Sequence, residues 1–164
     1  MTLIPSLKRL LLAAVLAWLP QQALALCTLV CACSASTTAV AFGTYNPISG
    51  ADLTGTGNVR VTCGGVLGLA VPYTVALDTG TYGTAFARKM GNGTKRLNYN
   101  LYTDTGAVWG NGSGGTETMG GQVDIILLGG TSQNLAVKGK IPGGQSTVAP
   151  GNFTDTVTVT ITYL

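Results

Sequence analysis

Apolar and polar residues alternate with a period of two in many short runs of this chain, and the longest run lies near the C-terminus. From Phe153 to Tyr163, the apolar residues Val157, Val159, Ile161 and Tyr163 alternate with threonines. Alternation of β-branched and polar residues is typical of a half-buried β-strand. On this pattern we predict seven strands, over Thr38–Phe42, Val59–Cys63, Val71–Leu77, Leu97–Tyr102, Val123–Leu128, Leu135–Ile141 and Phe153–Tyr163.

Turn-rich segments separate the predicted strands, and no helix-length amphipathic pattern occurs after the N-terminal segment. Glycine and asparagine supply the positive φ angles of tight turns, as in Gly91–Gly93 and Trp109–Gly115. Strands in this number, joined by turns, favour an all-β sandwich with one core. The residues predicted to face the core are Val59, Val61, Cys63, Val71, Tyr73, Val75, Leu77, Leu97, Tyr99 and Leu101, with Asn98 and Asn100 on the opposite face.

The predicted strand at Phe153–Tyr163 has no later strand to pair with one of its edges. An exposed apolar edge is a template for the addition of a strand from another molecule. We therefore expect the sandwich to be incomplete at its C-terminal edge. Val157, Val159, Ile161 and Tyr163 are expected to bind the strand of a partner, as in a subunit that polymerises or is held by a chaperone.

Residues 1–25 have the three parts of a secretory signal peptide. A basic pair precedes the apolar run Leu10–Leu19, and Ala23-Leu24-Ala25 fits the small-residue rule for cleavage. The apolar run is too short to span a bilayer, and no later segment reaches the roughly 18 apolar residues of a membrane span. We expect residues 26–164 to form one exported domain.

The ionisable residues exclude several functions. The chain has nine Lys and Arg, two of them in the signal peptide, so seven remain against six acidic residues and the net charge falls from +3 to +1. Nucleic-acid-binding domains carry a larger basic excess. Histidine, the commonest general base, is absent. The carboxylates are scattered over predicted turns and strand ends, at Asp52, Asp78, Asp104, Glu117, Asp124 and Asp155. We therefore expect no catalytic, cofactor-binding or metal site.

The cysteines Cys27, Cys31, Cys33 and Cys63 predict disulfides in an exported chain. In a straight strand, Cys27 and Cys31 would lie about 13 Å apart at ~3.3 Å per residue, too far for a disulfide without a bend. Cys33 and Cys63 are the natural cross-strand pair, which leaves Cys27 with Cys31. Two alternatives are a zinc site made by all four thiolates and a lipid anchor at Cys27 or Cys33.

Eight short motifs are spread in order along nearly the whole mature chain. They are Cys33–Pro47, Val59–Cys63, Tyr73–Leu77, Arg88–Met90, Leu97–Tyr102, Trp109–Gly110, Gly139–Gln145 and Phe153–Tyr163. Together they resemble the ordered motifs of the spore coat protein U domain family, which includes subunits of archaic chaperone-usher pili. The resemblance implies an immunoglobulin-like sandwich that lacks its final strand. It also implies a periplasmic chaperone that lends this strand, an outer-membrane usher, and a neighbouring subunit whose N-terminal extension replaces the chaperone.

The chain departs from the pilin pattern at two places. A donor extension needs roughly ten alternating residues at ~3.3 Å each, to match the strand that it replaces. In the expected mature chain, only the seven residues Leu26–Ala32 precede Cys33, and two of them are cysteines. We therefore expect poor homopolymerisation by donation of the N-terminal extension. Lys138 stands where family members often carry an aromatic residue.

We therefore expect a non-enzymatic structural subunit of a surface pilus or coat, assembled by strand complementation and exported through the periplasm to the cell surface or the extracellular space. The alternative is a secreted adhesive or sugar-binding module that acts as a monomer or tip subunit through loops near Trp109. The aromatic residues are more typical of the core of a sandwich than of a sugar-binding face. A secreted hydrolase is disfavoured by the absence of histidine.

Overall fold

The computed structural model describes residues 31–65, 68–126 and 130–164. In this part of the chain there are nine strands, β1 (Ala32–Thr38), β2 (Leu53–Gly64), β3 (Ala70–Leu77), β4 (Tyr82–Thr84), β5 (Ala87–Asn92), β6 (Lys95–Tyr102), β7 (Met119–Asp124), β8 (Thr131–Ile141) and β9 (Val159–Tyr163). The same part contains no helix that is long and apolar enough to cross a membrane. The predicted signal peptide, residues 1–25, lies outside the described residues.

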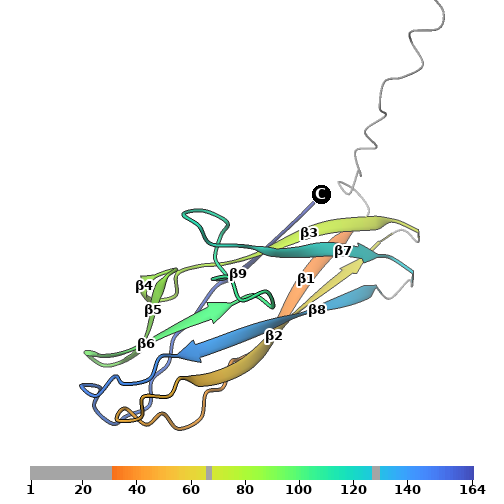
Figure 1. Ribbon diagram of the computed structural model, residues 1–164. Helices are drawn as coiled ribbons and strands as arrows, with labels where there is room; N and C mark the ends of the chain where they lie inside the picture. Colours follow the sequence, from red (N-terminus) through yellow and green to blue (C-terminus); the bar gives the residue numbers. More distant parts are fainter. Residues whose placement is uncertain (1–30, 66–67, 127–129) are drawn as a thin grey trace, which may run out of the picture.

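The strands form two antiparallel sheets that face each other in an immunoglobulin-like β-sandwich (Figure 1). One sheet has six strands in the order β1-β2-β8-β6-β5-β4, and the other has three in the order β7-β3-β9. The prediction of an all-β sandwich is confirmed.

The core between the sheets contains the residues that the alternation placed there. Val61, Val71 and Val75 are fully buried, and the other residues predicted to face inward are at most 6% exposed. Trp109 is also fully buried, and its indole Nε1 donates a hydrogen bond of 3.0 Å to the carbonyl oxygen of Val75. A period of two therefore identified the inner faces of β2, β3 and β6 correctly.

The strand boundaries differ from the predicted ones in several regions. The strand predicted at Phe153–Tyr163 begins only at Val159, because the residues before it pass from β5 to β3. The hairpin of β4 and β5 was not predicted, because one of the two inward positions on β5 is a charged residue, Arg88, and this hides the apolar alternation. β7 begins at Met119 and ends at Asp124, where the sequence predicted a strand from Val123 onward. The strand predicted at Thr38–Phe42 is wrong, because β1 already ends at Thr38.

After β1 the chain crosses the inner face of the six-stranded sheet instead of continuing as a strand. Gly55 of β2 and Gly139 of β8 are register partners and leave that face without side chains. A Cβ on Gly55 would lie 2.7 Å from the carbonyl oxygen of Ala41, and one on Gly139 would lie 2.6 Å from atoms of Val40 and Phe42. The side chains of the crossing segment therefore fill the space that these two glycines leave open.

Arg88 is a fully buried charged residue that ties several loops together. Its guanidinium donates to the carbonyl oxygens of Asp78 (2.6 Å), Ala85 (3.2 Å) and Trp109 (2.8 Å), and to the side-chain oxygen of Asn100 (2.8 Å). Asn100, which was predicted to face outward, is instead buried beside Arg88. Burial lowers the pKa of the guanidinium, but arginine keeps its charge at physiological pH.

The glycine crossing predicts a position-dependent cost for alanine in β2. We expect Gly55→Ala to lower the free energy of unfolding by about 1–3 kcal/mol, because the backbone of Ala41 would have to lift off the sheet. Gly64→Ala is the matched control in the same strand, since the nearest atom to its Cβ would lie 3.9 Å away. Urea unfolding of both variants measures the difference. Equal stability of the two variants would contradict the crossing.

Candidate functional site

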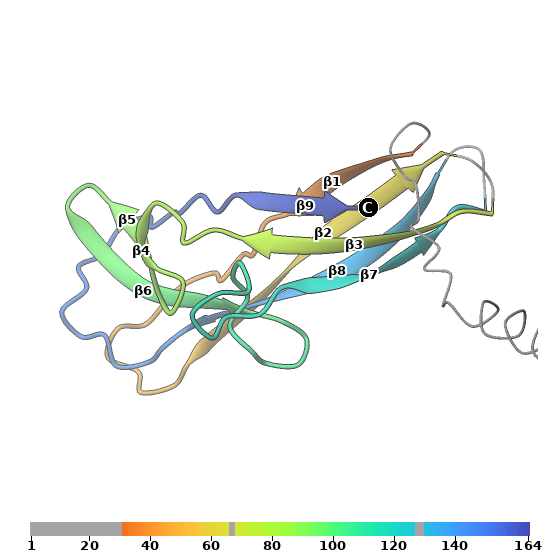
Figure 2. The same cartoon turned by 90° about the horizontal axis from the view of Figure 1, so that it is seen from above.

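Two edge strands, one from each sheet, leave the sandwich open along one margin. β1 pairs with β2, and β9 pairs with β3, and neither has a second partner strand within the described ranges. Figure 2 shows β1 and β9 next to each other at this margin. Ala35 and Thr37 of β1 face the same way as their buried partners Val61 and Val59 of β2, yet they are exposed. The three-stranded sheet therefore does not cover the inner side of β1.

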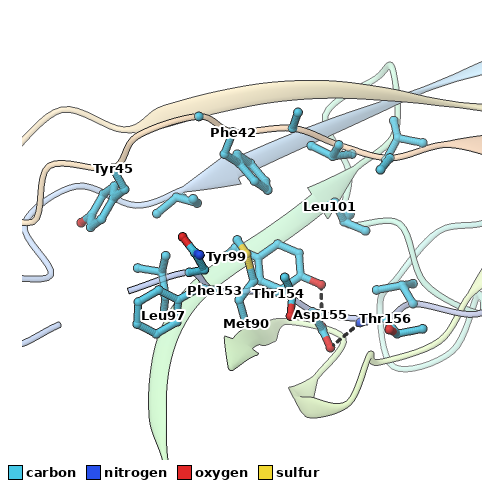
Figure 3. A pocket seen from close by; sticks show the side chains of 18 of the residues that line it. Phe42, Tyr45, Met90, Leu97, Tyr99, Leu101, Phe153, Thr154, Asp155 and Thr156 are labelled. Atoms are coloured by element: carbon cyan, nitrogen blue, oxygen red, sulfur yellow. Dashed lines mark hydrogen bonds between the residues drawn. The ribbon is translucent and has the colours of Figure 1, made fainter. Parts of the chain in front are cut away.

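An apolar groove of about 890 Å³ opens at this margin. Its first wall is the continuous segment 37–45, and its second wall is the continuous segment 148–157. Figure 3 shows Phe42 and Tyr45 on the first wall, Phe153 and Asp155 on the second, and Tyr99 on the floor. The residues of the floor are Val59, Leu77, Met90, Leu97, Tyr99, Leu101, Val137 and Ile141.

Most of the backbone of the first wall is unpaired. The ladder between β1 and β2 ends at Thr38, and residues 39–44 make no hydrogen bond to any residue that the structure describes. The end of this wall is fixed by Tyr45, whose hydroxyl donates to the carbonyl oxygen of Pro142 (2.9 Å) and accepts from the amide of Gln145 (3.0 Å). The wall is thus held by side chains at its end and along the glycine crossing.

The second wall and β9 carry a longer row of unpaired backbone groups. Pairing with β3 uses the even-numbered residues, because the amide of Asp78 donates to the carbonyl oxygen of Thr158 (3.1 Å) and the amide of Leu164 to that of Pro72 (3.4 Å). In an antiparallel ladder, alternate residues direct these groups to opposite edges. The odd-numbered residues from 153 to 163 therefore direct N–H and C=O toward the open margin. None of them has a backbone partner among the described residues.

Backbone and carboxylate contacts hold the second wall at both ends of its course from β5 to β9. Thr154 exchanges two backbone hydrogen bonds with Gly91 of β5, of 2.8 and 3.1 Å. The amide of Thr158 donates to the carboxylate of Asp78 (3.0 Å). Between these points the wall passes from one sheet to the other, and it has no strand on the side away from the groove within the described part of the chain.

Asp155 makes three hydrogen bonds in this gap. One carboxylate oxygen accepts from the amides of Thr81 (2.9 Å) and Thr156 (2.9 Å). The other accepts from the hydroxyl of Tyr99 (2.6 Å), which comes from the floor of the groove (Figure 3). The carboxylate therefore connects the second wall to a loop and to a strand of the six-stranded sheet.

The local environment shifts the pKa of two of these groups. Partial burial alone would raise the pKa of Asp78, but hydrogen bonds from Thr158 and Gly80 and the charge of Arg88 outweigh it, so the pKa lies below its ordinary value. Burial and the hydrogen bond to Asp155 raise the pKa of Tyr99 far above its ordinary value. At neutral pH the Asp78 carboxylate is thus charged and the Tyr99 hydroxyl keeps its proton.

The structure brings two of the four predicted strand-binding residues into the groove. Val157 and Val159 line it, although Val157 precedes the first residue of β9. Ile161 and Tyr163 have the same parity and are half-buried against the core, but they lie beyond the lining of the groove.

The sequence prediction missed the first wall and the floor of the site. Val40, Phe42 and Tyr45 lie on the first wall, and Tyr99 lies on the floor. The segment Thr38–Phe42 was predicted to be a strand, and its residues were not among those predicted to bind a partner. No local signal in the sequence indicated that this segment is one side of a groove.

The cysteines agree with the predicted cross-strand pair. Cys33 and Cys63 are register partners in β1 and β2, and they form a disulfide with their Cα atoms 4.1 Å apart. The alternative zinc site of four thiolates is therefore wrong, and the described residues contain no cluster of three or more potential metal ligands. Cys31 is also disulfide-bonded. Its predicted partner, Cys27, lies outside the described residues.

The alternative of a sugar-binding face near Trp109 is contradicted at its main residue. Trp109 has no exposed surface, and its indole nitrogen is bonded to the backbone of β3. A fully buried ring cannot stack on a ligand. The aromatic residue of this loop belongs to the core.

Comparison with known proteins identifies the family. Residues 20–160 match the Spore Coat Protein U domain, and the chain belongs to this family. Its fold is similar to a chain in the crystal structure of the CsuC–CsuE chaperone–tip adhesion subunit pre-assembly complex from the archaic chaperone-usher Csu pili of Acinetobacter baumannii, with 24% identity and a TM-score of 0.55. The match covers 80% of this chain and 39% of that chain, which is well under half of the longer protein. Among curated proteins, no sequence matches.

The lowered pKa of Asp78 predicts a loss of stability in acid. A carboxyl whose pKa is lower in the folded state stabilises the fold above its unfolded pKa of about 4, and this contribution disappears as the pH falls through the folded value. We expect Asp78→Asn to remove this part of the acid sensitivity, at a cost of about 1 kcal/mol near neutral pH. Thermal unfolding from pH 7 to pH 2 measures it. The exposed Asp104→Asn is the control, and an identical pH profile for both variants would contradict the assignment.

Proposed function

We propose that this protein is an exported structural subunit of a surface pilus or coat, and that a strand from another protein completes its sandwich. A periplasmic chaperone supplies the strand first, and a neighbouring subunit, brought by an outer-membrane usher, then replaces it. Val157, Val159, Ile161 and Tyr163 bind that strand. The role is structural rather than enzymatic.

The observation that carries this proposal is the row of unpaired backbone groups at the odd-numbered residues 153–163. A buried N–H or C=O without a partner costs about 1–3 kcal/mol, so the groove cannot be closed by apolar side chains alone. An extended strand with apolar residues at every second position satisfies both the backbone edge and the apolar floor. A strand of about 11 residues, roughly 36 Å long at ~3.3 Å per residue, would match the whole row.

The family and the solved relative support the same function. The chain belongs to the Spore Coat Protein U domain family, and the relative of similar fold is described as part of a complex between a chaperone and a pilus tip adhesion subunit. The signal peptide predicted at residues 1–25 and the Cys33–Cys63 disulfide support passage through an oxidising compartment outside the cytoplasm.

A donor strand fused to the chain tests the proposal directly. A strand of alternating valine and threonine, joined after Leu164 by a short Gly-Ser linker, would run antiparallel to β9 and enter the groove. Each fully buried valine contributes about 1.5–3 kcal/mol, so we expect the fusion to raise the free energy of unfolding by several kcal/mol. Urea unfolding of the fused and unfused chains measures the gain.

The matched control for the fusion carries aspartate in place of each valine of the donor strand. This control should give no gain, because charged side chains cannot enter the apolar floor. Equal stability of the two fusions would refute strand complementation. The proposal would also fail if the unfused chain were a monomer whose amides at odd positions 153–163 resist hydrogen exchange.

Substitutions along β9 test which face binds the donor. We expect Val159→Asp to abolish the stabilisation by the fused strand, because it places a charge in the groove. Thr160→Asp should keep most of it, since Thr160 is exposed on the opposite face. Unfolding of the unfused variants separates damage to the core from loss of binding. If Val159→Asp left the gain from the fusion intact, the groove would not be the binding site.

A further inference from the structure

We propose that Asp155 positions the second wall of the groove for strand binding, with the hydroxyl of Tyr99 as its anchor on the floor. This inference rests on the proposed function and explains how the accepting edge is held in place before a strand arrives. It assigns Asp155, one of the scattered carboxylates of the sequence, a role in positioning rather than in chemistry.

The second wall needs such a residue because it has no backbone partner on its outer side between Thr154 and Thr158. Thr154 is bonded to Gly91 of β5, and Thr158 is bonded to Asp78 after β3. In between, the amide of Thr156 bonds to the side chain of Asp155 instead of to a neighbouring strand. The carboxylate takes the place of the missing ladder.

The carboxylate also fixes the wall to two other parts of the fold. It accepts from the amide of Thr81, in the loop between β3 and β4, and from the hydroxyl of Tyr99 in β6. Tyr99 is only 6% exposed, so its ring is a rigid anchor. Gly80 has a φ of +75°, and a Cβ there would overlap the Asp155 carboxylate, so this loop is shaped to receive it.

The position of the wall determines which of its backbone N–H and C=O groups face the groove. Alternate residues of an extended segment point their backbone groups to opposite edges, so a slip of one residue would turn the odd-numbered N–H and C=O groups away from the groove. A wall whose odd-numbered N–H and C=O groups already face the groove does not have to be ordered when a strand binds, and this lowers the entropic cost of binding. Asp155 lies within the stretch where such a slip would occur.

The donors around Asp155 suggest a conservative and a disruptive variant. All three partners donate to the carboxylate, so Asp155→Ala loses every bond. Asp155→Asn can keep all three, because its oxygen accepts from the amides of Thr81 and Thr156 while its NH₂ donates to the Tyr99 oxygen after the hydroxyl rotates. A positioning role therefore predicts rescue by asparagine.

The experiment measures coupling between Asp155 and the fused valine-threonine strand in a double-mutant cycle. Unfolding free energies are measured for the fused and unfused chains with aspartate, alanine or asparagine at position 155. We expect Asp155→Ala to reduce the equilibrium gain from the fused strand at least tenfold, which is about 1.4 kcal/mol. Asp155→Asn should keep the gain, and the exposed control Asp104→Ala should not change it.

A merely structural role for Asp155 would lower the stability of the fused and unfused chains equally, and this result would overturn the inference. Failure of asparagine to rescue the gain would also overturn it. If the fused strand failed to stabilise the wild-type chain, the proposed function would be wrong. Limited proteolysis of the unfused chain would then still decide whether Asp155 holds the wall, since Asp155→Ala should expose residues 155–158 to cleavage and Asp155→Asn should not.

Discussion

The N–H and C=O groups at the odd-numbered residues 153–163 need hydrogen-bond partners, and much of the sandwich is arranged around that need. Water satisfies these groups while the margin is open. A closed sandwich would have to supply a strand there, and β1, the neighbouring edge strand, pairs with β2 and forms no ladder with β9. The apolar groove beside the row adds a second requirement, because whatever pairs with the backbone must also present apolar side chains to the groove. An extended segment of alternating apolar residues meets both requirements together.

The two walls stay apart because each one leaves its own sheet where specific residues hold it: glycines make room for the first wall, and side-chain hydrogen bonds hold the second. The first wall crosses the six-stranded sheet where Gly55 and Gly139 provide room. The second wall crosses from β5 to β3 where no strand lies beside it, and side chains take over the bonding. Arg88 helps to fix the end of this crossing. Its guanidinium donates to the carbonyl oxygen of Asp78, and the carboxylate of Asp78 accepts from the amide of Thr158. A buried guanidinium suits this place, because its five donors can satisfy several carbonyl groups that converge without a strand.

The sequence revealed the elements of the fold that obey a simple period. The inward residues of β2, β3 and β6, the cross-strand disulfide and the half-buried face of β9 all follow from alternation, because a strand has a side-chain period of two. β5 was missed because Arg88 occupies an inward position, and an inward charge is favourable only with hydrogen-bond partners that the alternation of apolar and polar residues does not reveal. The first wall was missed for a related reason. Its conformation depends on glycines in β2 and β8, and no pattern within residues 38–45 reports on them.

The Cys33–Cys63 disulfide joins β1, an edge strand of the open margin, to β2. β1 and β9 approach each other at this margin, and each has one free edge, so a shift of β1 toward β9 would let these two edges pair. That rearrangement would close the groove and remove the accepting edge. Cys33 and Cys63 join β1 to β2 as direct register partners, and a covalent bond between adjacent strands opposes such a shift at that end. At the other end, the bonds of Tyr45 to Pro142 and Gln145 hold the first wall away from the second. One covalent tie in β1 and one polar tie at Tyr45 thus hold the chain on both sides of residues 39–44, whose backbone has no partner among the described residues.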